Sequence, residues 1–229
     1  MFIVSERWKE TYPDAMVAVL VLQNVENRKV DEGLEQRKQE LENELSLRIE
    51  TESDLKALKP AQAYTAYYKR FKKTYPLLQQ LKTLVFKKKS FPVVSALVDA
   101  MFMAEMKNLL LTAGHDLAKL SLPIAVDISQ GNESYIKLSG ETQALKSGDM
   151  IMADQEGVIS SVLYGPDQRT KMTIDTREAL FVVYAPAGVE KEGLQGHLED
   201  IKENVVLFSP SAEIEAAKIF TALDETDVL

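Results

Sequence analysis

An uninterrupted apolar run rich in β-branched residues occupies residues 15–23, with the sequence AMVAVLVLQ. A continuous run of this length and composition is typical of a strand whose two faces are both buried. The next segment, residues 29–49, changes to helix-forming residues and places Leu34, Leu41 and Leu45 on one narrow stripe. This spacing predicts an outer helix that packs against the core along one edge.

Three more helical features follow along the chain. The sequence TESD at residues 51–54 predicts a cap or turn, and residues 61–74 predict a second helix that ends before Pro76. Residues 95–112 give the strongest helical pattern, because Ala, Met, Leu and Phe fill nearly every turn. We therefore expect this helix to be central to the core and to end at Gly114 in the left-handed conformation.

Between residues 123 and 186 the sequence consists of short β-like runs separated by clusters of Gly, Asp and Asn. The runs are residues 124–128, 135–138, 150–153, 158–164 and 179–184. Residues 193–206 and 212–223 then predict two closing helices. The pattern indicates an α/β protein of the α+β kind, in which a mixed or antiparallel sheet packs against helices.

Length and composition narrow the class of protein. The chain has 229 residues, 45% apolar content and no cysteine, which excludes disulfides, thiolate catalysis and sulfur-ligated metal sites. Its apolar runs are too short to cross a bilayer, and its start lacks a signal-peptide core. We expect a cytoplasmic protein with no membrane contact, no metal and no cofactor.

One segment departs strongly from the acidic composition of the chain. Residues 56–97 contain ten basic residues and no Asp or Glu, leaving 17 basic against 35 acidic residues elsewhere in a chain of net charge −8. The cations alternate with Tyr64, Tyr67, Tyr68, Phe71 and Tyr75. In one interpretation, Lys and Arg meet phosphates while the rings stack on bases. In the other, the cations form the solvated face of an amphipathic helix and the rings its buried face.

Few residues suggest catalysis, because the chain has no phosphate-binding loop, no nucleophile elbow and no zinc-protease motif. His115 and Asp116 are adjacent, so the imidazole is a candidate proton carrier, although such a pair often caps a helix. The other histidine, His197, is predicted to be an exposed helix residue because Glu199 and Asp200 follow it.

Two polar turns supply the remaining candidates. The sequence DQEG at residues 154–157 predicts a turn between strands, and its Glu156 is a candidate partner for His115 and Asp116 around a bound water. Arg169 follows the turn at residues 164–167. Its planar guanidinium is suited to a phosphate or carboxylate, or it pairs with Asp167 or Asp175.

The run VSALVDAMFMAEMKNLLLTAGHDLAKL, residues 94–120, resembles without a gap a segment of the B3/B4 domain in the bacterial phenylalanyl-tRNA synthetase beta subunit. The later run GDMIMADQEGVISSVLYG, residues 148–165, is similar to a second segment of that domain. The whole chain, including YYKRFKKTYP and AGHDL, resembles stand-alone B3/B4 proteins without a synthetase core. The resemblance implies a compact α/β module associated with tRNA.

In the synthetase, this domain hydrolyses tRNA that carries tyrosine in place of phenylalanine. The Thr-Asn pair of the family falls here on Met101 and Phe102, its histidine falls on Ala113, and its editing glutamate falls on Val182. Asp116 is kept. Loss of these polar groups removes donors for the developing oxyanion, and each missing donor typically costs about a hundredfold or more in rate.

These observations leave three functional hypotheses. The first is a tRNA-associated RNA-binding module, non-catalytic or weakly catalytic, that binds phosphates through Lys69, Arg70, Lys72, Lys73 and Arg169. The second is a hydrolase that deacylates mischarged aminoacyl-tRNA in trans with His115, Asp116 and Glu156. The third is a pocket for an amino acid or a small metabolite.

The organisation expected from the sequence is one B3/B4-like domain over residues 1–229. It comprises an N-terminal part with the basic segment (1–90), the core motif region (91–186) and C-terminal helices (187–229).

Overall fold

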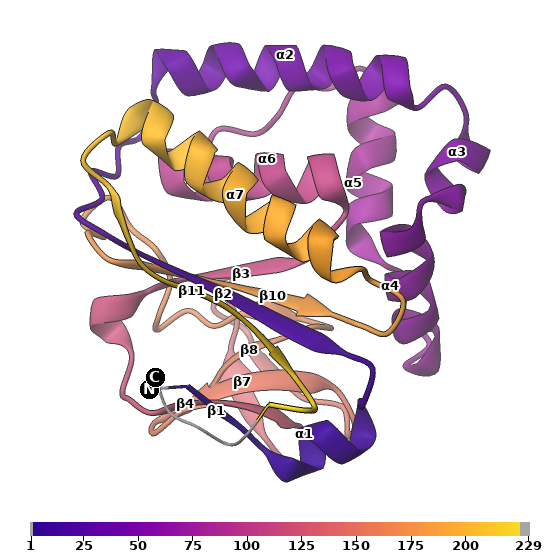
Figure 1. The fold of residues 1–229 in the computed structure, drawn as a ribbon, viewed down its shortest axis with the longest axis vertical. Helices are drawn as coiled ribbons and strands as arrows, with labels where there is room; N and C mark the ends of the chain where they lie inside the picture. Colours follow the sequence, from indigo (N-terminus) through magenta and orange to yellow (C-terminus); the bar gives the residue numbers. More distant parts are fainter. Residues whose placement is uncertain (1, 225–229) are drawn as a thin grey trace.

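The computed structural model describes residues 2–224, in which a layer of helices is stacked on two sheets and one short helix, α1 (Glu6–Thr11), lies beside the lower sheet (Figure 1). The strands are β1 (Phe2–Val4), β2 (Met16–Gln23), β3 (Thr112–Asp116), β4 (Ile124–Ile128), β5 (Ser134–Ile136), β6 (Thr142–Ala144), β7 (Met150–Asp154), β8 (Gly157–Ser161), β9 (Gly165–Pro166), β10 (Ala179–Ala185) and β11 (Glu213–Thr221). The helices are α1 (Glu6–Thr11), α2 (Glu32–Arg48), α3 (Glu52–Ala57), α4 (Lys59–Arg70), α5 (Pro76–Val85), α6 (Ala96–Asn108) and α7 (Lys191–Phe208), with a 3-10 turn, η1 (Leu117–Lys119).

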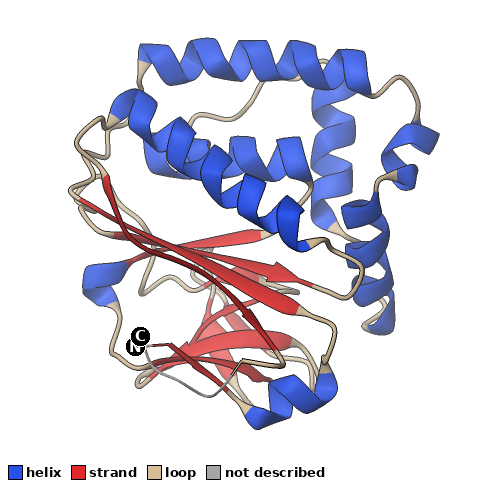
Figure 2. Ribbon diagram, viewed as in Figure 1, coloured by secondary structure: helices blue, strands red, loops and turns tan. Residues whose placement is uncertain are grey.

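The middle layer is an antiparallel sheet with strand order β11-β2-β10-β3. Below it lies a second sheet, β1-β4-β7-β8-β9, in which β1 and β4 are parallel and the other pairs antiparallel (Figure 2). A small two-stranded sheet, β5-β6, packs against the second sheet at β8. The predicted α+β class, with a mixed sheet packed against helices, is confirmed.

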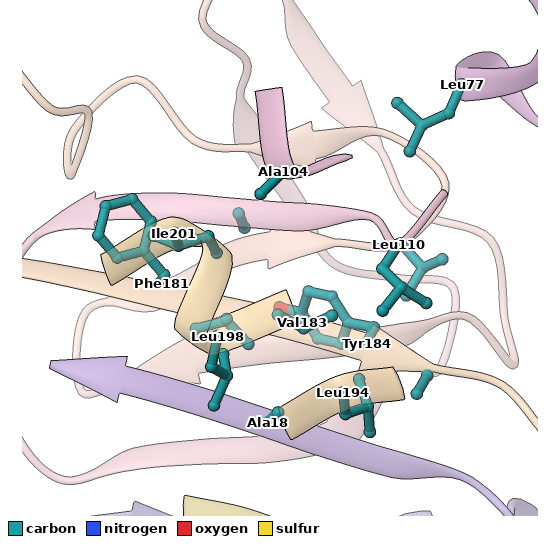
Figure 3. Packing of buried hydrophobic residues seen from close by; sticks show 14 of the residues in the cluster. Ala18, Leu77, Ala104, Leu110, Phe181, Val183, Tyr184, Leu194, Leu198 and Ile201 are labelled. Atoms are coloured by element: carbon teal, nitrogen blue, oxygen red, sulfur yellow. The ribbon is translucent and has the colours of Figure 1, made fainter. Parts of the chain in front are cut away.

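The middle sheet is buried on both faces, which explains the uninterrupted apolar run of its central strand β2. Six consecutive residues of β2, from Val17 to Leu22, are buried, and so is the whole of β10. On the helical side, Figure 3 shows Leu194, Leu198 and Ile201 of α7 lying over these two strands. Burial of such side chains contributes roughly 1.5–3 kcal/mol each.

The structure corrects two expectations about where elements begin and end. The second closing helix is wrong, because residues 213–221 form β11, which pairs with β2 across a β-bulge between Ile214 and Ala216. The core helix ends at Asn108, and Leu109, not Gly114, takes the left-handed conformation with φ 54°.

Gly114 instead lies inside β3, packed closely against two methionine side chains. A Cβ atom at this position would overlap the Cε atom of Met172 and lie 3.1 Å from the Sδ atom of Met101, so a larger residue would force these side chains to shift.

A buried ion pair joins α2 to α6. The Lys38 ammonium lies 2.7 Å from Asp99 and 2.6 Å from Glu35, and it also donates to the carbonyl of Pro92. Lys38 and Asp99 are each 3% exposed. Such a pair contributes little net stability compared with apolar residues of similar size, but removing one partner leaves an uncompensated charge in the core.

We therefore expect Lys38→Ala to lower the free energy of unfolding by about 3–5 kcal/mol. The double variant Lys38→Met, Asp99→Leu should lose less, because it removes both charges and keeps most of the packed volume. Urea unfolding of the three proteins measures the difference. A double variant less stable than Lys38→Ala would contradict this account of the pair.

Candidate nucleic-acid interface

Five aromatic residues of the basic segment, Tyr64, Tyr67, Tyr68, Phe71 and Tyr75, face the interior. The tyrosine hydroxyl groups tie α4 and the loop after it to both sheets and to the end of α6. Tyr64 donates to the carbonyl of Tyr184, Tyr67 to Asp149 Oδ1 at 2.6 Å, Tyr68 to the carbonyl of Val162 at 2.6 Å and Tyr75 to the carbonyl of Leu109 at 2.8 Å. These four rings and Phe71 are buried, so the interpretation that they stack on bases is wrong. Their burial agrees with the amphipathic interpretation, and phosphate binding by the cations stays a prediction.

The C-terminal end of α4 gathers four cations on the surface, Lys69, Arg70, Lys72 and Lys73, which we call the α4 patch. Lys69, Arg70 and Lys72 are exposed and Lys73 is half-buried. The chain turns sharply here, because Lys72 N donates to Lys69 O and Lys73 N to Tyr68 O. This is a Schellman cap, and its left-handed position, usually glycine, is Lys72 with φ 56°.

The cations of the basic segment differ in their partners. Lys56 and Lys82 lie 3.9 Å and 2.6 Å from Glu52, and Lys59 lies 2.5 Å from Glu190. No member of the α4 patch forms an ion pair with a carboxylate of residues 2–224. The α4 patch therefore concentrates uncompensated positive charge on an acidic molecule.

Two aromatic rings lie beneath the cations of the α4 patch. The Lys73 ammonium is 4.3 Å from the centre of the Tyr164 ring, and the Arg70 guanidinium carbon is 5.0 Å from the centre of the Tyr12 ring. A fifth cation, Lys146, donates to the carbonyl of Phe71 at 2.7 Å. Cation–π contacts of this kind restrict long side chains and leave their charge accessible. Sequence reasoning missed Tyr12, Tyr164 and Lys146, which lie far from the basic segment in the sequence.

A second exposed basic group follows α5 at Lys87, Lys88 and Lys89. Lys88 donates to Ser46 Oγ at 3.1 Å and also has a positive φ, 51°. The neighbouring ring, Phe86, is 38% exposed. This group serves as the natural comparison for the α4 patch, because it carries similar charge at another place on the molecule.

The histidine predicted as a proton carrier is in β3 and fully buried. His115 Nδ1 lies 2.7 Å from Thr170 Oγ1, whose hydroxyl donates to Asp167. Because the threonine proton is used on Asp167, Nδ1 carries the hydrogen and Nε2 keeps its lone pair. Nε2 has no hydrogen-bond partner among the described residues. Burial, with the nearby charge of Arg169, lowers the pKa of His115 to about 3, so the imidazole is neutral at pH 7.

Asp116, Glu156 and Arg169 lie around the same loop, but each is engaged by neighbours. Asp116 accepts from Thr176 Oγ1 at 2.9 Å, and Glu156 accepts from the Ser121 hydroxyl. Arg169 lies 2.8 Å from Asp154 and 3.7 Å from Glu156. The closest carboxylate to Arg169 is thus Asp154, whereas the sequence suggested Asp167, at 3.8 Å, or Asp175.

The structure therefore does not bring the predicted site residues together at one cavity. A cavity of about 350 Å³ beside the β7-β8 hairpin is lined in part by Glu156, Asp167 and Arg169. None of the cations of the α4 patch lines that cavity. His115 does not line it either.

The two positions that the resemblance aligns with the family's histidine and editing glutamate carry apolar side chains. Ala113 of β3 and Val182 of β10 lie opposite each other in the antiparallel register, and both are buried. The sheet thus brings together the two positions that the resemblance singled out, with an apolar pair there. Residues 2–224 also show no cluster of three or more His, Cys, Asp or Glu that could hold a metal ion.

The second histidine is also buried, contrary to the expectation of an exposed helix residue. His197 Nε2 lies 2.7 Å from Thr112 Oγ1, and Nδ1 lies 3.2 Å from the amide of Asn108. Burial lowers the pKa of His197 to about 4. The residue joins α7 to β3 and to the end of α6.

The family is shown by the comparison with known proteins. A model of the B3/4 domain matches residues 59–199. The chain belongs to the B3/4 domain family. Among solved structures, an N-terminal fragment of the phenylalanyl-tRNA synthetase beta-subunit from Pyrococcus horikoshii is similar, with 16% identity and a TM-score of 0.46. The match covers 96% of this chain and 50% of that fragment. No curated protein matches the sequence significantly. None of the described helices has the length and apolar character needed to cross a membrane.

One buried carboxyl group near the tyrosines makes the stability of the protein depend on pH. Glu105 of α6 accepts a hydrogen bond from Thr112 N at 2.7 Å, and burial raises its pKa to about 8. A carboxyl group whose pKa is raised by folding contributes stability that is fully present when the pH is below its ordinary pKa of 4.5. That contribution is lost as the pH rises to 8.

Between pH 6.5 and pH 8 we expect the contribution of Glu105 to the free energy of unfolding to fall by about 2 kcal/mol in the B3/4 protein. Both histidines have pKa values lowered by folding and titrate near 6.5 in the unfolded chain, so their contribution still rises at the start of this range and offsets part of the fall. Glu105→Gln should remove the fall, as measured by urea unfolding of both proteins at half-unit pH steps. An equal slope in both proteins would show that Glu105 is ionised in the folded state.

Proposed function

We propose that this B3/4 protein is a non-catalytic RNA-binding module whose α4 patch binds the phosphate backbone of tRNA. The carrying observation is the α4 patch itself: four surface cations without a carboxylate partner in the described part of a chain of net charge −8. Lys59 and Lys82 of the same basic segment, by contrast, lie next to carboxylates. Cations left unpaired and grouped favour a polyanionic ligand.

The α4 patch is also conformationally restricted, which favours binding in addition to the effect of its charge. The turn after α4 is fixed by its Schellman bonds, and Arg70 rests on the Tyr12 ring. Side chains that are already restricted lose less entropy when they bind. The left-handed backbone of Lys72 adds to this support, because a side chain at such a position costs stability and glycine would avoid that cost.

The choice of tRNA among RNAs rests on the sequence resemblance to the synthetase domain. The choice of binding over hydrolysis rests on the apolar side chains at Ala113 and Val182, where the family has its histidine and glutamate. A hydrolytic site needs donors aimed at the oxyanion and a base within reach of a water. Neither position supplies one.

Charge reversal of the α4 patch tests the proposal. The unmodified protein should bind tRNA with log affinity falling against log salt concentration at a slope of about −3, as expected for four phosphate contacts. Changing Lys69, Arg70, Lys72 and Lys73 to Glu should abolish binding at physiological salt. Fluorescence anisotropy with labelled tRNA measures both quantities.

The matched control reverses four other cations of the same segment, Lys56, Lys87, Lys88 and Lys89, and so makes the same change in net charge. This variant should keep tRNA affinity within about threefold, because phosphate contacts act at short range in salt. Circular dichroism of both variants checks that they are folded. Equal loss of binding in both, or none in the α4 patch variant, would refute the assignment.

A hydrolase acting on mischarged tRNA is the second candidate, and His115 is the observation that favours it. Its Nε2 lone pair is buried and unpartnered within residues 2–224. The hydrogen bond between Nδ1 and Thr170, which in turn donates to Asp167, fixes the ring as a general base requires. Against it, the ring is fully buried, so no substrate contacts it in this conformation.

A panel of misacylated tRNAs distinguishes the two candidates. We expect the purified protein to release amino acid no faster than the uncatalysed reaction, with no change in His115→Ala. Release that is clearly accelerated by the unmodified protein and lost in a folded His115→Ala variant would establish the hydrolase instead.

A further inference from the structure

Tyr164 differs from the other seven tyrosines of the chain in its exposure. The structure buries Tyr12, Tyr64, Tyr67, Tyr68, Tyr75, Tyr135 and Tyr184, whereas Tyr164 is half-buried. It lies between β8 and β9, outside the basic segment, and the fold brings it next to Lys73 of the α4 patch. The rings next to the α4 patch in the sequence are buried, whereas Tyr164, from another part of the chain, is half-buried beside it.

The ring of Tyr164 lies between a small apolar cluster and the Lys73 side chain. It packs against the small cluster of Tyr135, Leu145 and Ile151. The Tyr164 N–H donates to Ser161 Oγ at 3.1 Å, which fixes the start of the turn. The Lys73 ammonium, 4.3 Å from the ring centre, covers the ring on the side of the α4 patch.

This arrangement matches the physical requirements of single-strand recognition. An unpaired base needs an accessible ring to stack on, and its phosphates need cations within a few ångströms. In a duplex the bases are already stacked on one another, so a ring beside the phosphates gains nothing. A phosphate also competes with the ring for the Lys73 ammonium, and when Lys73 turns to the phosphate the ring face becomes free for a base.

We infer that Tyr164 is the ring on which the α4 patch stacks one unpaired base, so that the preferred ligand is a single-stranded RNA segment. The inference rests on the proposed function, since it takes the α4 patch as the phosphate-binding surface. It adds the class of RNA and one residue that determines specificity. The hydroxyl group of Tyr164 is not needed for stacking, so a phenylalanine should serve equally well.

The experiment compares an eight-nucleotide single-stranded RNA with a duplex of the same sequence. Tyr164→Leu should weaken single-strand binding about tenfold, which is within the range of one base–aromatic stack. Tyr164→Phe should stay within twofold of the unmodified protein. Duplex affinity should be the same in all three proteins. The salt slope should be unchanged in Tyr164→Leu, because the ring contacts no phosphate.

The matched control is Phe86→Leu, which removes the exposed ring beside Lys87, Lys88 and Lys89. It should leave single-strand affinity unchanged. Thermal unfolding of each variant checks the fold, and Tyr164→Phe separates loss of the ring from loss of the hydroxyl group.

Two failures are distinguishable. If Tyr164→Leu binds the single strand as tightly as Tyr164→Phe, or if Phe86→Leu produces the loss instead, the stacking role of Tyr164 is wrong while RNA binding by the α4 patch stands. If reversing the α4 patch leaves single-strand affinity unchanged, the proposed function itself is wrong.

Discussion

The attachment of α4 to the two sheets is the constraint on which the rest of the structure depends. Tyrosine hydroxyls reach from one face of this helix to polar groups of both sheets, and a hydroxyl buried without a partner would cost about 1–3 kcal/mol. Tyr64 binds the carbonyl of Tyr184 in the middle sheet, while Tyr67 binds Asp149 beside the lower one. The helix is therefore fixed in rotation, and its cations must face the solvent.

Because the orientation of α4 is fixed, the basic and aromatic segment can contribute its rings to the core and its cations to the surface. The aromatic residues supply the packing that closes the side of the two sheets, and the cations follow at the end of the helix, where they also interact favourably with its dipole. Neither role requires the rings to contact a ligand. A ring from another part of the chain, Tyr164, lies beneath Lys73 at the surface instead.

The fold could be predicted from the sequence where local pattern and tertiary environment agree. The apolar run of β2 is buried on both faces as expected, and α2 and α7 begin and end within a few residues of their predicted limits. β11 could not be predicted, because its residues favour a helix and only pairing with β2 makes it a strand. Burial of His197 depends in the same way on partners distant in sequence, Thr112 and Asn108.

The candidate site was predictable in composition but not in arrangement. The excess of positive charge in residues 56–97 is visible in the sequence, whereas the pairing that neutralises Lys59 and Lys82 depends on Glu190 and Glu52, which the fold brings close. The same applies to Arg169, whose closest carboxylate is Asp154 on the β7-β8 hairpin. Charge counts identify a segment, and only the fold decides which of its cations are left unpaired.

Hydrogen–deuterium exchange of the protein with and without tRNA tests the central claim most directly. The account predicts slower exchange on binding at the end of α4 and in the β8-β9 turn, two segments that are distant in sequence and joined by the contact of Lys73 with Tyr164. Residues 87–89 should exchange equally fast in both states. Protection confined to residues 87–89, or to α7, with none at the end of α4, would contradict it.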